Sequence, residues 1–170
     1  MNRVRVMPLV AVLLVPAAAL AQDGAPRTTL FSIAGGASQY DIGNTGTGIV
    51  IATRSPILAG RFAVIEPGIT FFSYVNQFSR RTNLLLPEIS LQATLPGGRV
   101  RPFVGGGIGF STYLSGPNRN ELTLHIVSGV RLFLPGTWGI SAEVRARTID
   151  PWAGRTLDFT LGLLRMPRRF

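Results

Sequence analysis

Eight segments of the sequence alternate between apolar and polar residues, and this period of two limits the possible folds more than any other feature. Successive side chains of a β-strand point to opposite faces, so each segment predicts a strand with one apolar and one polar face. In the fourth segment Ile89 and Leu91 fall on one face, and Ser90 and Gln92 fall on the other. Almost no segment has a helical apolar period, so the sequence predicts an all-β fold. The eight segments cover residues 29–40, 47–54, 61–75, 83–95, 100–113, 121–134, 138–148 and 156–165.

The start of the chain has the pattern of a secretory signal peptide. A short basic stretch with Arg3 and Arg5 precedes an apolar run, and Ala19 and Ala21 form an A-x-A cleavage site. We therefore expect residues 1–21 to be removed after export. The alternative is an uncleaved anchor helix, but the apolar run is short for a membrane span and prolines interrupt it.

The composition excludes several classes of function. The sequence has no cysteine and a single histidine, His125. It therefore predicts no disulfide, no metal site and no lipid-anchored cysteine, and we expect no cofactor. Its 17 basic residues are all arginines and outnumber 8 acidic residues. The basic residues form no clustered basic helix, so we expect no nucleic-acid partner and instead partners with phosphate or carboxylate groups.

The connections between the segments indicate which face points inward. A soluble barrel turns its apolar face inward, and a membrane barrel turns it toward lipid. Pro-Gly pairs make tight turns at 95–99 and 134–138, with 55–60 as a third connection at the same end. The connections at the other end are longer and more polar, as in outer-membrane barrels, where the tight turns face the periplasm. Segments of about ten residues are long enough for tilted strands to cross a bilayer.

A glycine-rich stretch, residues 101–110, fits the same interpretation. It lacks the third glycine of the G-x-G-x-x-G dinucleotide motif, and its bulky apolar residues are untypical of a linker. With the apolar face toward lipid, Gly105, Gly107 and Gly109 line the lumen. We expect this glycine stripe to make room for long side chains from other strands, since an eight-stranded barrel has a narrow interior.

The same alternation places charged side chains inside the barrel. Buried charges need partners, so we expect a lumenal network of arginine–carboxylate pairs that fills the interior. A gated or conducting pore is the alternative, but the interior of so small a barrel is typically filled. The predicted network consists of Glu66, Glu88, Arg101, His125, Arg131, Glu143, Arg145, Arg147 and Asp158.

Three stretches together resemble the small outer-membrane β-barrel family, the eight-stranded relatives of the OmpA and OmpX transmembrane domains: 101–110, 129–147 and 157–170. The resemblance implies an eight-stranded antiparallel up-and-down transmembrane barrel in the outer membrane of a Gram-negative bacterium. Residues 22–28 would form a short periplasmic segment and residues 29–170 the barrel domain. It also implies that the last strand and Phe170 engage the barrel-assembly machinery, although residues 166–169 depart from the family's alternating ending.

The family includes structural, adhesive and enzymatic members, so the resemblance leaves the activity open. A structural, membrane-integrity or surface-interaction role in a monomer is our main expectation. A lipid A deacylase would use His125, Ser128 and Glu143, but strand parity sends Ser128 to the opposite face, and Glu143 is about 13 Å from His125 along the strands. A soluble periplasmic barrel that binds an apolar ligand is a further alternative.

Arginines in the longer connections suggest a lipid partner. Guanidinium groups at the outer rim suit the phosphates of lipopolysaccharide, whereas a merely solvated rim is the simpler interpretation. The possible lipopolysaccharide contacts are Arg80, Arg81, Arg119 and Arg155.

Overall fold

The computed structural model describes residues 30–40, 46–59, 62–75, 81–95, 98–115, 120–149 and 154–166, and these contain strands and turns but no helix. Within these ranges, therefore, no helix is long and apolar enough to span a membrane. The strands are β1 (Phe31–Tyr40), β2 (Gly46–Arg54), β3 (Ile57–Leu58), β4 (Ala63–Val75), β5 (Arg81–Thr94), β6 (Val100–Tyr113), β7 (Asn120–Phe133), β8 (Trp138–Ile149) and β9 (Gly154–Arg165).

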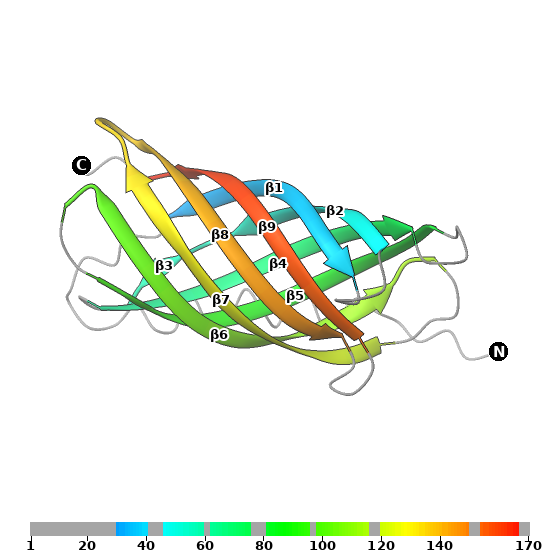
Figure 1. The fold of residues 1–170 in the computed structure, drawn as a ribbon. Coiled ribbons are helices and arrows are strands. Elements are labelled where there is room, and N and C mark those ends of the chain that lie inside the picture. Colours follow the sequence, from blue (N-terminus) through cyan, green and yellow to red (C-terminus); the bar gives the residue numbers. More distant parts are fainter. Residues whose placement is uncertain are drawn as a thin grey trace.

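The strands form one antiparallel sheet that closes into a tilted barrel (Figure 1). Each strand from β4 to β8 pairs with the next one in the chain, and β1 lies between β2 and β9. The pairing of β2 with β4 completes the ring. The two-residue strand β3 continues the line of β2 along β4, so the barrel has eight strands around its circumference. The predicted eight-stranded antiparallel barrel is confirmed.

The segment predicted as a connection after β2, residues 55–60, is partly strand. Proline has no backbone N–H, so Pro56 interrupts the hydrogen-bond ladder. The amide of Ser55 still donates to the carbonyl of Pro67 at 2.9 Å, and Ile57 then pairs with Ile65. The chain therefore keeps its place beside β4 for longer than the sequence pattern suggested.

The two ends of the barrel differ in their connections. At one end, here called the hairpin end, β5 joins β6 and β7 joins β8 through short turns (Figure 1). Gly98 and Gly136 lie in these turns with φ of 64° and 101°, a conformation that residues with a side chain rarely adopt. The opposite end, here called the long-connection end, holds the chain between β1 and β2, β4 and β5, β6 and β7, and β8 and β9.

Burial alternates along the strands as the sequence pattern predicted. On β5, Glu88, Ser90 and Gln92 are buried in the lumen, whereas Leu91 points outward and is 64 % exposed. The outer surface carries large apolar side chains on β1, β2 and β4 through β9. The lumen therefore holds the polar side chains and the outer wall holds apolar ones, which inverts the order of a soluble barrel.

The part of the lumen toward the long-connection end is apolar. Val50, Phe72, Tyr74, Leu84 and Leu86 pack against one another there, with a further contact from a partly buried tyrosine of β6. The charged side chains lie in the remaining part of the lumen, which is the candidate functional site.

Candidate functional site: the charged lumen

The strand register brings the charged residues to neighbouring positions inside the barrel. On β7, His125 pairs with Gly107 of β6 on one side and with Arg147 of β8 on the other. Across the next interface, Arg145 of β8 pairs with Asp158 of β9. These residues share the inward face because their positions have the same parity along each strand.

Glu88 on β5 lies at the centre of the network. Its Oε1 accepts a hydrogen bond from Nη1 of Arg145 at 2.8 Å and another from Oγ1 of Thr70 at 2.8 Å. Its Oε2 is paired with Nη1 of Arg147, and it lies 3.7 Å from Nδ1 of His125. The carboxylate is almost completely buried, so its interactions with the arginines and the threonine replace those with water.

Glu66 on β4 forms a second group closer to the hairpin end. Its Oε2 accepts from Nη2 of Arg131 at 2.9 Å, and its Oε1 accepts from Nη2 of Arg145 at 3.0 Å and from Nε2 of Gln92 at 2.8 Å. The guanidinium of Arg131 also lies over the ring of Phe103, 4.0 Å from the centroid. Arg145 therefore joins the two carboxylate groups of the lumen.

Two further carboxylates complete the network. Asp158 accepts from Nε of Arg147 at 2.6 Å and from Oγ of Ser38 at 2.7 Å. Glu143 lies 2.9 Å from Nη2 of Arg54. Each of the four carboxylates in the network thus has at least one guanidinium partner, which buried charges require.

The network is balanced in charge. It contains the four carboxylates Glu66, Glu88, Glu143 and Asp158 and the four guanidinium groups of Arg54, Arg131, Arg145 and Arg147. All eight side chains are buried. Among the described residues, no group of three or more histidine, cysteine or acidic side chains is arranged to hold a metal ion. The arrangement is suited to filling and stabilising the lumen.

Two arginines depart from the predicted set. Arg54 was not predicted, because it ends its segment, but its parity with Val50 and Ala52 indicates the inward face that it occupies. Arg101 was predicted in the network, but its guanidinium lies over the ring of Phe133 at 4.9 Å and forms no ion pair with another described residue. It is only partly buried, close to the hairpin end.

The glycine stripe lies against the network. A Cβ at Gly107 would come within 2.8 Å of Nε2 of His125, and one at Gly109 would come within 3.0 Å of Cβ of Glu88. At Gly105 it would meet Cγ of Gln92 at 2.8 Å. Any larger residue at these positions would displace lumenal side chains or the backbone of β5.

A serine, a histidine and a glutamate meet in the lumen, although they are not the trio that a lipid A deacylase was considered to use. Oγ of Ser90 lies 2.7 Å from Nε2 of His125, whose Nδ1 faces Glu88. Ser128, by contrast, points to the outer wall and is not brought near His125. Ser90 is only 1 % exposed, and Nη1 of Arg145 lies 3.4 Å from its Oγ, so a substrate has no room to approach.

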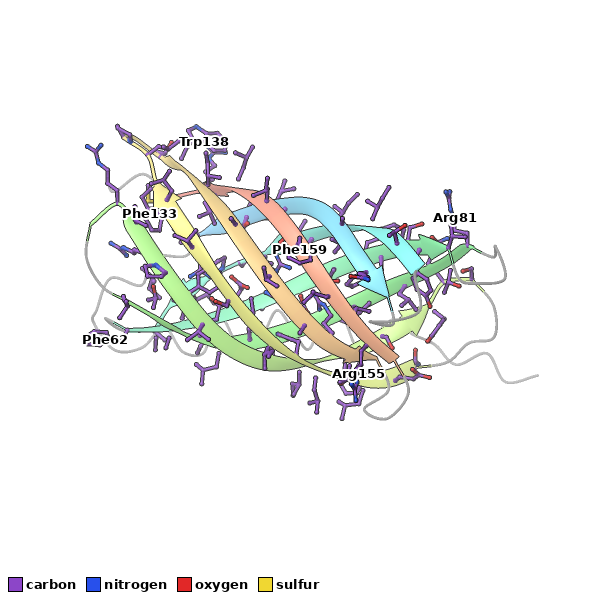
Figure 2. The ribbon with its side chains drawn as sticks, in the orientation of Figure 1. Phe62, Arg81, Phe133, Trp138, Arg155 and Phe159 are labelled. Carbon is purple, nitrogen blue, oxygen red and sulfur yellow. The ribbon has the colours of Figure 1, made fainter. Side chains whose placement is uncertain are left out.

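The predicted rim arginines are only partly described. Arg81 at the start of β5 and Arg155 near the start of β9 are exposed at the long-connection end (Figure 2). Arg80, Arg119 and Phe170 lie outside the described residues.

Comparison with known proteins bears on the fold. No protein-family model and no curated protein matches the sequence. Among solved structures, Neisserial surface protein A is similar with a TM-score of 0.59 and 12% identity, covering 81% of this chain and 96% of its own. The chain has the fold of small eight-stranded outer-membrane β-barrels.

Two other structures show the same likeness. The N-terminal β-barrel domain of OprF from Pseudomonas aeruginosa has a TM-score of 0.57 and 12% identity, over 82% of this chain and 97% of that one. Ail of Yersinia pestis, solved with the heparin analogue sucrose octasulfate, has a TM-score of 0.51 and 12% identity, over 83% and 99%. The family resemblance of the sequence is therefore confirmed for the fold.

Proposed function

We propose that the protein is an integral outer-membrane β-barrel of a Gram-negative bacterium with a structural, membrane-integrity or surface-interaction role. One observation carries the proposal: ion pairs fill the lumen while large apolar side chains cover the outer wall. In water, an apolar wall around the whole circumference would be strongly unfavourable, whereas lipid tails match it.

The same observation weighs against a soluble barrel that binds an apolar ligand. Such a protein needs an apolar cup and a polar outer wall. Here the buried cluster of Val50, Phe72, Tyr74, Leu84 and Leu86 fills its end of the lumen, and Ile126 and Leu161 on the outside are each 68% exposed.

Membrane fractionation tests the proposal. The expressed protein should stay with the outer membrane through a carbonate wash, enter detergent extracts, and migrate differently on gels when boiled and unboiled. Recovery of a soluble monomer from the periplasm would reject the membrane assignment.

A second proposal concerns lipopolysaccharide at the long-connection end. Arg81 and Arg155 are exposed there, and guanidinium groups bind phosphates through paired hydrogen bonds. Replacing Arg80, Arg81, Arg119 and Arg155 together with Gln should reduce the lipopolysaccharide that co-purifies with the barrel. The matched control is Arg99→Gln at the hairpin end, and an unchanged lipid content in the fourfold variant would remove this proposal.

A third proposal concerns the assembly of the barrel in the cell. The resemblance of its ending to the family suggests that Phe170 engages the barrel-assembly machinery during insertion. Deletion of Phe170 should lower the amount of folded barrel in cells without changing the stability of barrel refolded in detergent. Equal amounts in cells would contradict the proposal.

A further inference from the structure

The outer wall of β8, β9 and β1 has an arginine between two aromatic side chains at the hairpin end. The register pairs Arg165 of β9 with Trp138 of β8 and with Phe31 of β1. All three point outward, and the guanidinium of Arg165 lies 5.9 Å from the ring centroid of Trp138. Figure 2 shows Trp138 at this end of the barrel. No ion pair joins Arg165 to another described residue, so its cation is available to a ligand.

A groove lies on the same wall, midway between the ends of the barrel. It has a volume of about 540 Å³, and its lining includes Gly35, Ser128, Ala142, Val144, Phe159 and Leu161. Figure 2 shows Phe159 on this wall, between the two ends. A Cβ at Gly35 would meet only the backbone oxygen of Val50, at 3.9 Å, so the space outside this residue is open.

An apolar track joins the arginine to the groove. Leu163 of β9 lies between Arg165 and Leu161 on the same face, with Ile140 and Ile33 beside it in register. Four residues of strand span about 14 Å, or about 10 Å along the barrel axis if the strands tilt by about 45°. One leaflet of the hydrocarbon core is about 15 Å thick, so the groove lies within reach of an acyl chain whose phosphate is at Arg165.

We propose that this wall binds one phospholipid, with its phosphate on Arg165 and an acyl chain running past Leu163 into the groove. Trp138 and Phe31 suit the interfacial level of the headgroup, where aromatic side chains gather in membrane proteins. The inference rests on the proposed insertion into the outer membrane. It names phospholipid rather than lipopolysaccharide because the hairpin end then faces the periplasmic leaflet, opposite to Arg81 and Arg155.

Native mass spectrometry with phosphatidylglycerol as the probe tests the site. The barrel, refolded in detergent and verified by its gel shift, would be titrated with this lipid. Arg165→Gln should lower the affinity for the first bound lipid about fivefold, from about 1 kcal/mol per basic side chain at a membrane surface. Gly35→Leu should lower it by at least as much, because the new side chain fills the groove.

Matched controls separate this site from general coating by lipid. Arg99→Gln removes an exposed arginine from the same end, and Ala93→Leu adds a leucine side chain to the outward face of β5. Both should leave the affinity unchanged. Ala142→Leu is a second groove variant, for use if Gly35→Leu fails to fold.

Each alternative outcome contradicts the proposal. Equal losses in controls and site variants would mean unspecific lipid coating, and no loss in either site variant would mean that the wall holds no specific lipid. Preferential retention of added lipid A, or a dimer that Gly35→Leu disrupts, would assign the wall to another occupant. A barrel that shows the gel shift but lacks the lipid site would refute this inference and leave the membrane assignment standing.

Discussion

Substitution of Glu88 by Gln is the sharpest perturbation of the lumen. The change keeps the size of the side chain and removes the carboxylate that Arg145 and Arg147 contact directly. Arg54 also lies within 3.9 Å of it. Because the lumenal ion pairs balance four carboxylates against four guanidinium groups, the variant leaves the buried network with one excess positive charge, although each arginine keeps another carboxylate partner.

Removing one partner of a buried ion pair costs about 3 to 5 kcal/mol. With a slope of about 2 kcal/mol per molar urea for a small protein, the unfolding midpoint should fall by about 1.5 to 2.5 M. The assay is urea unfolding of the barrel refolded in vesicles, followed by tryptophan fluorescence and by the gel shift. Glu121→Gln, at the long-connection end, is the control and should change the free energy of unfolding by less than about 1 kcal/mol.

A double variant separates lost charge balance from lost packing. Glu88→Gln combined with Arg147→Gln restores neutrality, so its free energy of unfolding should fall by less than the sum of the two single losses. An unfolding midpoint of Glu88→Gln equal to that of the unmodified protein would refute the reasoning, and strict additivity in the double variant would refute the charge-balance explanation.

Further predictions address the network, the glycine stripe and the pore. Glu143→Gln should lower the urea midpoint because Arg54 loses its 2.9 Å partner, and Arg54→Gln should lower it by a similar amount; unchanged midpoints would exclude this pair from the network. Gly107→Val should destabilise the barrel by about 1 to 3 kcal/mol or more, because its side chain would clash with the backbone oxygen of Ile89 and with the ring of His125. Gly98→Ala, at a turn with open space, should cost only its backbone strain. In planar bilayers the unmodified protein should conduct little, and large steady channels would contradict a filled lumen.

The sequence predicted the long strands well because their alternation extends over many residues. It missed β3 because Ile57 and Leu58 are too few to show a period and follow Pro56. It missed Arg54 because this residue ends its segment, although its parity with Val50 and Ala52 indicates the inward face. The contacts of Glu88 with arginines on β8 depend on how the strands are staggered around the barrel, and alternation within single strands does not define that stagger.

Neutral polar partners were also beyond prediction from the sequence. Thr70 and Ser90 share the lumenal face with many residues, and only the register shows that they reach Glu88 and His125. Strand parity alone, by contrast, was enough to separate Ser128 from His125, and Ser128 faces outward.

The central claim is that the apolar outer wall of the barrel faces lipid. The accessibility of spin labels along β9 to lipid and to water tests this claim most directly. The chain has no cysteine, so single cysteines can carry a nitroxide label without background. Labels at Leu157, Phe159, Leu161 and Leu163 in vesicles should be accessible to oxygen and shielded from a water-soluble nickel complex. A label at Ser128, a small outward residue of β7, should behave in the same way. Labels on this face that are accessible to the nickel complex, in protein that shows the gel shift, would contradict a barrel whose apolar wall faces lipid.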